Sequence, residues 1–490
     1  MSSRPAPGAR DLTTGPIAST LAAFALPVLG GNVLQSLNGS VNAIWIGNLL
    51  GEAALTATSN ANLVLFLLLG AVFGVAMAAT ILVGQAFGAR DIDRAKHVVG
   101  TGATFFFATS AVLATAGVIF TPAILRLLGT PAEALPLAIA YLRVIFVAVP
   151  FMNAFAFAMA VMRGAGDSKT PFYFMALSVA LDIVLNPLLI RGVGPIPALG
   201  IAGSALATLI AQGVSFAALL MLLYRRQHPL LPRRHELGHF RPQPHLLKAI
   251  VAKGVPMGLQ MVVISSAALA MMGLVNGYGV QTAAAYGVAA QLWTYIQMPA
   301  LAIGAAASSM AAQNVGAGRW DRVGRIAGAG IGFNIAMTGV LVVLLYFIDR
   351  AALGLFLPGD GGAIETAVHI NHLASWSFVL FGITIVLFGV VRATGAVMPP
   401  LIILCISLLG VRLPFAANLQ DSLGADAIWW SFPLGSAVSV VLALAYYRFG
   451  GWRKVQFAAS TPATGEAADT GVAAPTMDRD PEYQADPQSR

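Results

Sequence analysis

Residues 170–190, TPFYFMALSVALDIVLNPLLI, combine the length of a membrane span with a charge in its middle. An α-helix crosses the hydrocarbon core of a bilayer in about 20 apolar residues. Asp182 nevertheless lies inside this stretch, and Asn186 follows one helical turn later, directly before Pro187. A carboxylate at that depth costs roughly 2.5–3.5 kcal/mol on insertion scales, so its default interpretation is functional. The alternative is a structural carboxylate that hydrogen-bonds to a neighbouring helix.

The composition extends this conclusion to the whole chain. Of the 490 residues, 58% are hydrophobic and 10% are charged, and the mean hydropathy is +0.79. Soluble domains carry about 25% charged residues, so the sequence predicts an all-α polytopic membrane protein. The single cysteine, Cys405, excludes a disulfide framework. The formal charge of +8 comes from basic residues dispersed at helix ends, and we expect no nucleic-acid partner.

Hydropathy predicts twelve spans in two sets of six. The longest polar break between spans, RRQHPLLPRRHELGHFRPQPH, covers residues 225–245. We therefore predict a cytoplasmic N-terminal tail over 1–15, an N-lobe over 16–224, a cytoplasmic linker over 225–247 and a C-lobe over 248–450. Residues 451–490 are poor in large apolar side chains and are expected to be a disordered cytoplasmic tail. The spans are expected at about 18–44, 55–81, 97–121, 136–161, 170–190, 197–224, 249–276, 284–311, 326–348, 366–391, 398–419 and 427–447.

Basic residues set the expected orientation. If the N-terminus is cytoplasmic, 23 Lys and Arg residues fall on the cytoplasmic side and 5 fall outside. Cytoplasmic loops carry the excess of basic residues in membrane proteins. We therefore expect a multi-pass protein of the inner (plasma) membrane with both termini in the cytoplasm.

The two halves of the chain repeat each other. LVGQAFGARDIDRAKHVVG (82–100) aligns without gaps on MAAQNVGAGRWDRVGRIAG (310–328), and MRGAGDSKTP (162–171) aligns on VRATGAVMPP (391–400). Pro27 and Pro256 are likewise 229 residues apart. Six spans per half give both halves the same orientation. The repeat therefore predicts two six-helix lobes related by a pseudo-two-fold axis along the membrane normal, with a site between them.

Polar residues of the first half form the expected ion-coupling group. Asp182 and Asn186 share one helix face because they are four residues apart. Amides recur every three to four residues in the first span and form one stripe; they are Asn32, Gln35, Asn38 and Asn42. The alternative for this stripe is hydrogen bonding between helices without transport. The predicted ion-coupling residues are Asp182, Asn186, Asn42, Asn38 and Ser204, and the predicted hinges are Pro27 and Pro187.

The substrate cavity is predicted from polar and soft apolar residues of both halves. Its candidates are Gln35, Asn153, Gln260, Met261, Gln291 and Tyr295. Helix packing is the alternative for the second-half residues, and a satisfied amide is the alternative for Asn153. Val411 occupies the position equivalent to Asp182, so ion coupling is assigned to the first half. No His cluster has ligand spacing in the sequence, and we predict no metal site.

The repeated motifs, together with LDIVLNPLLI and GIAGSALAT, resemble the MATE (multidrug and toxic compound extrusion) family, bacterial or archaeal type, over about residues 15–450. The resemblance implies a twelve-helix antiporter that expels organic, often cationic amphiphiles in exchange for H⁺ or Na⁺, without a cofactor. It also implies that Pro27 is a bendable proline and that Ser204 lines the N-lobe cavity. Asn42 stands where many relatives have an acid. The Asn-then-Asp order of many relatives is reversed here as Asp182 and Asn186.

Two other functions stay open at this stage. A flippase for lipid-linked precursors would show a more basic central cavity, for which Arg143 and Arg412 are the candidates. A membrane-embedded enzyme would need a reactive cluster that the sequence does not show. We expect a transporter and not an enzyme, a monomer in the lipid bilayer, with small-molecule substrates.

Overall fold

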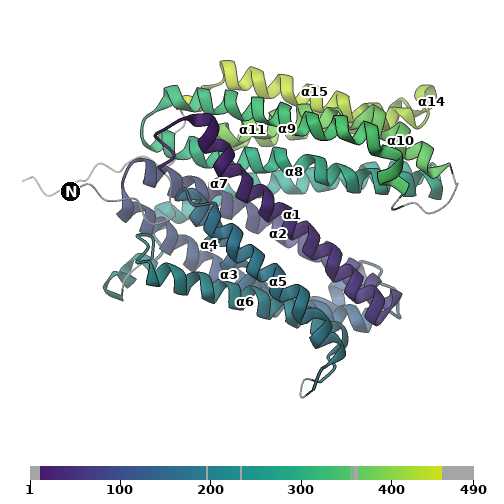
Figure 1. The fold of residues 1–490 in the computed structure, drawn as a ribbon, viewed down its shortest axis with the longest axis horizontal. Helices are drawn as coiled ribbons and strands as arrows, with labels where there is room; N and C mark the ends of the chain where they lie inside the picture. The colour runs from purple at the N-terminus through teal and green to yellow at the C-terminus, as the bar shows by residue number, and fades with distance from the viewer. Residues whose placement is uncertain (1–10, 195–196, 232–233, 355, 357–361, 455–490) are drawn as a thin grey trace, which may run out of the picture. The chain divides into compact units, whose positions relative to one another are not determined.

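The computed structural model describes residues 11–194, 197–231, 234–354, 356 and 362–454, which form helices and turns without strands. Contacts divide the chain after residue 457, and all described helices belong to the unit before it. The first half contains α1 (Ile17–Leu50), α2 (Glu52–Gly88), α3 (Ile92–Leu127), α4 (Leu135–Gly164), α5 (Lys169–Arg191) and α6 (Gly200–Arg225) (Figure 1). The second half contains η1 (Arg234–Phe240), α7 (Pro244–Asn276), α8 (Val280–Gly316), α9 (Trp320–Gly354), α10 (Ala363–Ala374), α11 (Ser377–Arg392), α12 (Met398–Leu404), η2 (Cys405–Arg412), α13 (Leu413–Asn418), α14 (Gln420–Leu423), α15 (Asp426–Phe449) and η3 (Gly451–Lys454).

These helices confirm the twelve predicted spans, two of which are interrupted. Nine described helical segments are long and apolar enough to cross a membrane, and α10 with α11 forms a tenth span bent by 47°. Helices α2 and α8, each of 37 residues, complete the twelve. The eleventh span runs through α12, η2 and α13, and its middle section is a π-helix.

The hydrophobic core joins the two lobes at one end of the bundle. We call α1–α6 the N-lobe and α7–α15 the C-lobe. The largest cluster of buried residues draws on both lobes, for example Ile81 and Ile303, near the connections that follow α2 and α8. At the opposite end each lobe has a core of its own, around Phe146 in the N-lobe and Trp429 in the C-lobe. The lobes are therefore packed together at the end that carries the basic connections, which we call the basic end.

Helices α2 and α8 cross closely at the basic end through two glycines. A Cβ atom on Gly88 would collide with the carbonyl oxygen of Gln313, and a Cβ atom on Gly316 would collide with that of Gln85. The absence of a side chain at both positions thus permits the backbones to touch.

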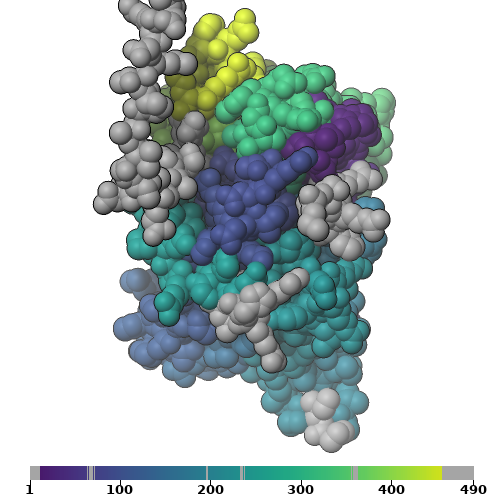
Figure 2. Space-filling view, turned by 90° about the vertical axis from the view of Figure 1, so that its left-hand side faces the viewer, coloured from purple at the N-terminus to yellow at the C-terminus, as the bar shows by residue number. Residues whose placement is uncertain are grey.

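The segment before α1 straps the N-lobe to the C-lobe. The Leu12 N–H donates to Gln313 Oε1 (3.2 Å), and Asn314 Nδ2 donates to the Leu12 carbonyl oxygen (3.0 Å). Arg322 Nη2 donates to the carbonyl oxygen of Gly15 (3.0 Å). Figure 2 looks onto this end, where the purple start of the chain's first helix lies against the green α8–α9 region.

The linker before α7 leads into the C-lobe but packs against α3 of the N-lobe. Lys96 Nζ is 2.7 Å from Glu236 Oε1, and His239 Nε2 is 2.9 Å from Asp93 Oδ1. The hydrogen bond to Asp93 raises the pKa of His239, helped by a second one to the Glu236 carbonyl. The side chains of Asp93, His97 and His239 have ligand-type atoms within 4.8 Å of one another. The sequence could not predict this cluster, because Asp93 and His239 are 146 residues apart.

Residues 451–454, the start of the predicted disordered tail, are folded in the structure. Residues Gly451–Lys454 form a short 3₁₀-helix, in which Trp452 is 1% exposed. The Trp452 ring stacks on Tyr447 at 4.9 Å between centroids, and its Nε1 donates to the Tyr447 carbonyl (2.7 Å). The prediction was wrong for 451–454, because one large aromatic side chain is enough to dock this short segment. Residues 455–490 lie outside the described residues.

Candidate ion-coupling site

Asp182 lies in the middle of a span because of where α5 begins. The Asp167 carboxylate caps the helix start by accepting from the backbone N–H groups of Lys169 (3.0 Å) and Thr170 (2.9 Å). From this start Asp182 is about 20 Å along the helix at 1.5 Å per residue, near the middle of a bilayer. Its side chain is buried, with 2% exposure.

Four side chains surround the Asp182 carboxylate. Its Oδ2 atom accepts from Asn38 Nδ2 and Asn42 Nδ2, both at 2.8 Å. Its Oδ1 atom accepts from Thr208 Oγ1 (3.2 Å) and Asn186 Nδ2 (3.3 Å). The donors come from α1, α5 and α6, so the carboxylate joins three helices of the N-lobe.

Asn186 hydrogen-bonds both to Asp182 on its own helix and to Asn42 on α1. Its Nδ2 atom also donates to Asn42 Oδ1 (3.0 Å), and the residue itself is fully buried. Two amide oxygens beside the carboxylate, Asn38 Oδ1 and Asn186 Oδ1, are buried without a hydrogen-bond partner in the described part of the chain. Buried polar atoms of this kind call for an explanation.

The donor set suits a negative charge and the unpaired oxygens suit a cation. Carboxylate oxygens accept hydrogen bonds, and donors occupy both oxygens of Asp182. Hard cations prefer oxygen ligands such as carboxylates and amide carbonyls. The site therefore combines hydrogen-bond donors to the Asp182 carboxylate with amide oxygens that a small cation would satisfy.

The hydroxyl group beside Asp182 belongs to Thr208 and not to the predicted Ser204. Ser204 is buried and contributes its backbone carbonyl, which accepts from Thr208 Oγ1 (3.4 Å). The hydroxyl that reaches the carboxylate is that of Thr208, one turn later on the same face of α6. A four-residue spacing from Ser204 was the signal that could have identified Thr208.

Two other carboxylates are buried in the described chain, and both lie near helix ends. Asp167 caps α5, as described above. Asp349 lies near the end of α9, where its Oδ2 atom is 2.9 Å from His372 Nε2. Among the buried carboxylates of the described chain, Asp182 is therefore the one that lies far from both ends of its helix.

Two of the predicted substrate-cavity residues are engaged inside a single lobe. Asn153 Nδ2 on α4 donates to Ser110 Oγ on α3 (2.7 Å). Gln260 Oε1 accepts from Arg392 Nη1 (3.2 Å), and its Nε2 donates to the Val397 carbonyl (3.4 Å). These hydrogen bonds agree with the alternative of a satisfied amide, and the role of both residues in substrate binding stays a prediction.

The other four cavity candidates keep accessible positions. Gln35 on α1 is exposed, as are Gln291 and Tyr295, which share one face of α8 with Gln291 Nε2 3.5 Å from the Tyr295 hydroxyl. Met261 on α7 lies opposite Gly70 on α2, where the two lobes meet. Their role in substrate binding stays a prediction.

The predicted hinges lie inside unbroken helices. Pro27 is within α1 and Pro187 within α5, directly after Asn186. In the C-lobe, the position equivalent to Asp182 is Val411 in the π-helix, and the guanidinium of Arg412 beside it lies 3.5 Å from the centre of the Phe432 ring. The two lobes therefore differ at this site: the N-lobe carries the carboxylate.

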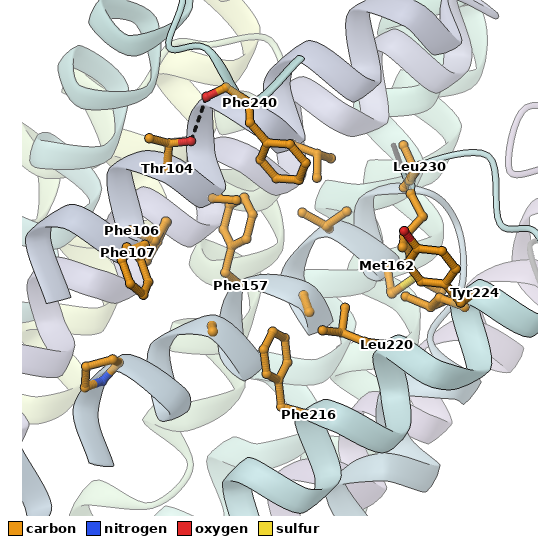
Figure 3. Close-up of a pocket in the computed structure, with 18 residues that line it drawn as sticks. Thr104, Phe106, Phe107, Phe157, Met162, Phe216, Leu220, Tyr224, Leu230 and Phe240 are labelled. Atoms are coloured by element: carbon orange, nitrogen blue, oxygen red, sulfur yellow. Dashed lines mark hydrogen bonds between the residues drawn. The ribbon is translucent and has the colours of Figure 1, made fainter. Parts of the chain in front are cut away.

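A pocket of about 560 Å³ lies elsewhere in the N-lobe, between α3, α4, α6 and the linker (Figure 3). Its walls are aromatic and aliphatic side chains such as Phe106, Phe157 and Phe216. None of the residues around Asp182 lines it. It is therefore separate from the candidate ion-coupling site around Asp182.

Comparison with known proteins places the chain in a family. Residues 27–188 and 256–417 each match the MatE family model, and the second match begins and ends 229 residues after the first. The chain belongs to the MATE family. The family domain occurs once per lobe, which confirms the predicted repeat. Membership identifies this MATE protein as a membrane transporter and not an enzyme, and it does not favour the flippase alternative.

Individual relatives agree with this assignment. A Bacillus subtilis (strain 168) protein described as a probable multidrug resistance protein, YoeA, is 38% identical over 439 residues, 89% of this chain and 94% of the relative. The multidrug export protein MepA of Staphylococcus aureus (strain NCTC 8325 / PS 47) is 25% identical, with 88% and 93% covered.

Solved structures share the fold of this MATE protein. A multidrug resistance MATE family transporter in an outward-facing conformation superposes with a TM-score of 0.83 at 20% identity, over 91% of this chain and 98% of that one. A point mutant of the Vibrio cholerae MATE transporter VcmN gives a TM-score of 0.81 at 20% identity, over 88% and 96%.

Proposed function

We propose that this MATE protein exports organic, often cationic amphiphiles across the plasma membrane in exchange for H⁺ or Na⁺, with Asp182 as the coupling carboxylate. The observation that carries the proposal is the mid-membrane carboxylate held by Asn38 and Asn42 of α1, with two unpaired amide oxygens beside it. Intramembrane carboxylates mark ion and proton pathways. The relatives described as multidrug transporters support the substrate class.

The packing of the lobes supports entry of the coupling ion from outside. The shared core closes the basic end, and the distribution of Lys and Arg assigns that end to the cytoplasm. Asn38 and Asn42 are half-buried and not fully enclosed. An ion from the outer side would therefore reach Asp182 through these two amides.

Neutralising Asp182 would change the packing of α1. A bound H⁺ or Na⁺ competes with the Asn38 and Asn42 amides for the Oδ2 atom, so the link between α1 and α5 weakens. Helix α1 packs against α5 in its own lobe and also against α8 and α9 of the C-lobe. Movement of α1, with bending at Pro27 and Pro187, would transmit the change to the other lobe and drive alternating access.

Transport from proteoliposomes under separately imposed gradients tests this function. The assay follows efflux of a fluorescent organic cation with an H⁺ gradient, a Na⁺ gradient, both or neither. We expect one gradient to accelerate efflux by wild type and to have no effect on Asp182→Asn. Asp349→Asn is the control, because it removes a buried carboxylate outside the site. Gradient-driven efflux by Asp182→Asn at the wild-type rate would exclude the coupling role.

A further inference from the structure

The pocket in the N-lobe is a crevice between two helices that do not pack against each other. Helices α3 and α6 both pack extensively against α4, which forms the floor of the crevice. The linker residues Leu230 and Phe240 cover its basic end. Figure 3 shows Phe157 of α4 below Phe240, with Phe106 and Phe107 on the α3 side and Phe216 and Leu220 on the α6 side.

The length of the crevice matches one leaflet of a bilayer. Its lining residues on α4 extend from Pro150 to Met162. Twelve residues of helix correspond to about 18 Å, and half of the hydrocarbon core is about 15 Å. The crevice therefore spans the depth that acyl chains of the cytoplasmic leaflet occupy.

The interior of the crevice is almost entirely apolar. Its polar lining groups are the hydroxyls of Thr104 and Tyr224. Thr104 Oγ1 already donates to the Phe240 carbonyl (2.8 Å), and this bond holds the linker over the pocket (Figure 3). Cavities with apolar walls do not hold ordered water, because a water molecule needs polar partners. An alkyl chain is the ligand that fits such walls.

The mouth of the crevice opens on the lateral surface of the N-lobe. Phe107 on α3 and Tyr224 on α6 line the pocket and are 71% and 58% exposed. In a bilayer the lateral surface of these helices meets lipid. Lipid chains therefore have direct access to the pocket.

Three arginines directly follow residues that line the crevice at its basic end. Arg225 and Arg226 directly follow Tyr224, and Arg241 directly follows Phe240. All three are exposed and form no ion pair within the described parts of the chain. Arginines at this level attract the anionic headgroups of the cytoplasmic leaflet.

We propose that the crevice binds an anionic phospholipid of the cytoplasmic leaflet. One acyl chain fills the pocket between α3 and α6, and the headgroup phosphate contacts Arg225, Arg226 and Arg241. The bound chain also packs under Leu230 and Phe240, so it holds the linker on the N-lobe. The site shares no residue with the Asp182 network and does not depend on the coupling ion.

Native mass spectrometry of the purified full-length protein tests the proposal, with phosphatidylglycerol and phosphatidylcholine of the same chains as probes. We expect wild type to retain about one phosphatidylglycerol in preference to phosphatidylcholine. Ala158→Phe on α4 and Ala103→Phe on α3 fill the pocket from different walls and should lose both lipids. Val340→Phe, on an exposed position of α9, is the matched control and should retain them.

The headgroup contacts are tested separately. Replacing Arg225, Arg226 and Arg241 by Gln should lower the preference for phosphatidylglycerol over phosphatidylcholine roughly fivefold per arginine, because the arginines attract the net negative charge of the phosphatidylglycerol headgroup. Arg448→Gln, an exposed arginine on α15, is the control. Wild-type retention by both wall variants, with each variant monodisperse in gel filtration, would overturn the pocket assignment. An unchanged lipid preference in the triple variant would overturn the anionic headgroup.

Discussion

Gln85 on α2 and Gln313 on α8 make the same hydrogen bond in opposite directions across the lobe interface. Gln85 Nε2 donates to the Ala393 carbonyl (2.7 Å), and Gln313 Nε2 donates to the Gly164 carbonyl (2.9 Å). The two donors occupy matching positions of the repeat, and so do the two acceptors. Each glutamine therefore links its own lobe to the other lobe at the closed basic end. The two hydrogen bonds are equivalent under the pseudo-two-fold axis that relates the lobes.

Gly88 and Gly316, each three residues after one of these glutamines, should be required for α2 and α8 to pack closely at the basic end. We expect Gly88→Ala and Gly316→Ala to separate α2 from α8, because the added Cβ collides with backbone carbonyls of the facing helix. Distances between spin labels on the α2–α3 and α8–α9 connections would then lengthen. Gly324→Ala on α9 has open space around its Cβ and should leave the distances unchanged, with a stabilising effect of about 0.5–1 kcal/mol.

Thr208, and not Ser204, should matter for ion coupling. Thr208→Val keeps the shape of the side chain but removes the hydrogen bond to Asp182 Oδ1. We expect its gradient-driven efflux to fall by about fivefold to tenfold, the effect of about 1–1.4 kcal/mol. Ser204→Ala should transport like wild type, because Ser204 contributes its backbone carbonyl. Equal losses in both variants would contradict the assignment.

A second carboxylate at position 42 should strengthen cation binding. In Asn42→Asp the new carboxylate faces Asp182 at hydrogen-bond distance, where Asn42 now donates at 2.8 Å. Two such carboxylates repel unless a proton or metal cation lies between them. We expect half-maximal efflux at an H⁺ or Na⁺ concentration on the order of tenfold lower. Ion titrations of transport in proteoliposomes would measure the shift, and a higher required concentration would count against it.

The linker should dock more firmly at low pH. The hydrogen bond to Asp93 raises the pKa of His239, so its protonated form favours the docked linker. This contribution is complete below the ordinary histidine pKa of about 6.5 and is lost as the pH rises through the raised value. Hydrogen exchange of residues 236–243, corrected for the intrinsic rate, should show greater protection at low pH. His239→Ala should abolish the difference, and His369→Ala should retain it.

The strap before α1 should contribute to stability through Arg322. Arg322 is 9% exposed, and its guanidinium donates to the Gly15 carbonyl (3.0 Å) and Asn314 Oδ1 (3.1 Å). We expect Arg322→Gln to cost about 2–3 kcal/mol and to lower the Tm in detergent. Arg325→Gln removes an exposed ion pair with Asp321 on the same helix and should change the Tm little.

Sequence alone predicted the features that follow from solvation and periodicity. The twelve spans follow from the cost of placing polar residues in lipid, and the two lobes follow from a repeat that the family matches also contain. Asp182 was identified because a carboxylate at mid-span depth is costly. Its pairing with Asn186 followed from helical spacing, and the amide stripe of α1 pointed to Asn38 and Asn42.

Tertiary structure decided which polar side chains meet. Asn153 and Gln260 carry the same amide group as Asn38 and Asn42, yet their amides donate to the Ser110 hydroxyl and the Val397 carbonyl and not to a carboxylate. The rotation of each helix about its axis selects the partner. The rotation of α6 about its axis likewise places the Thr208 hydroxyl against the Asp182 carboxylate, whereas Ser204 contributes its backbone carbonyl to the hydrogen bond with Thr208. The contact of His239 with Asp93 and the crevice between α3 and α6 depend on how distant segments pack. Hydropathy fixed which segments enter the membrane, and helix packing determined what each side chain touches there.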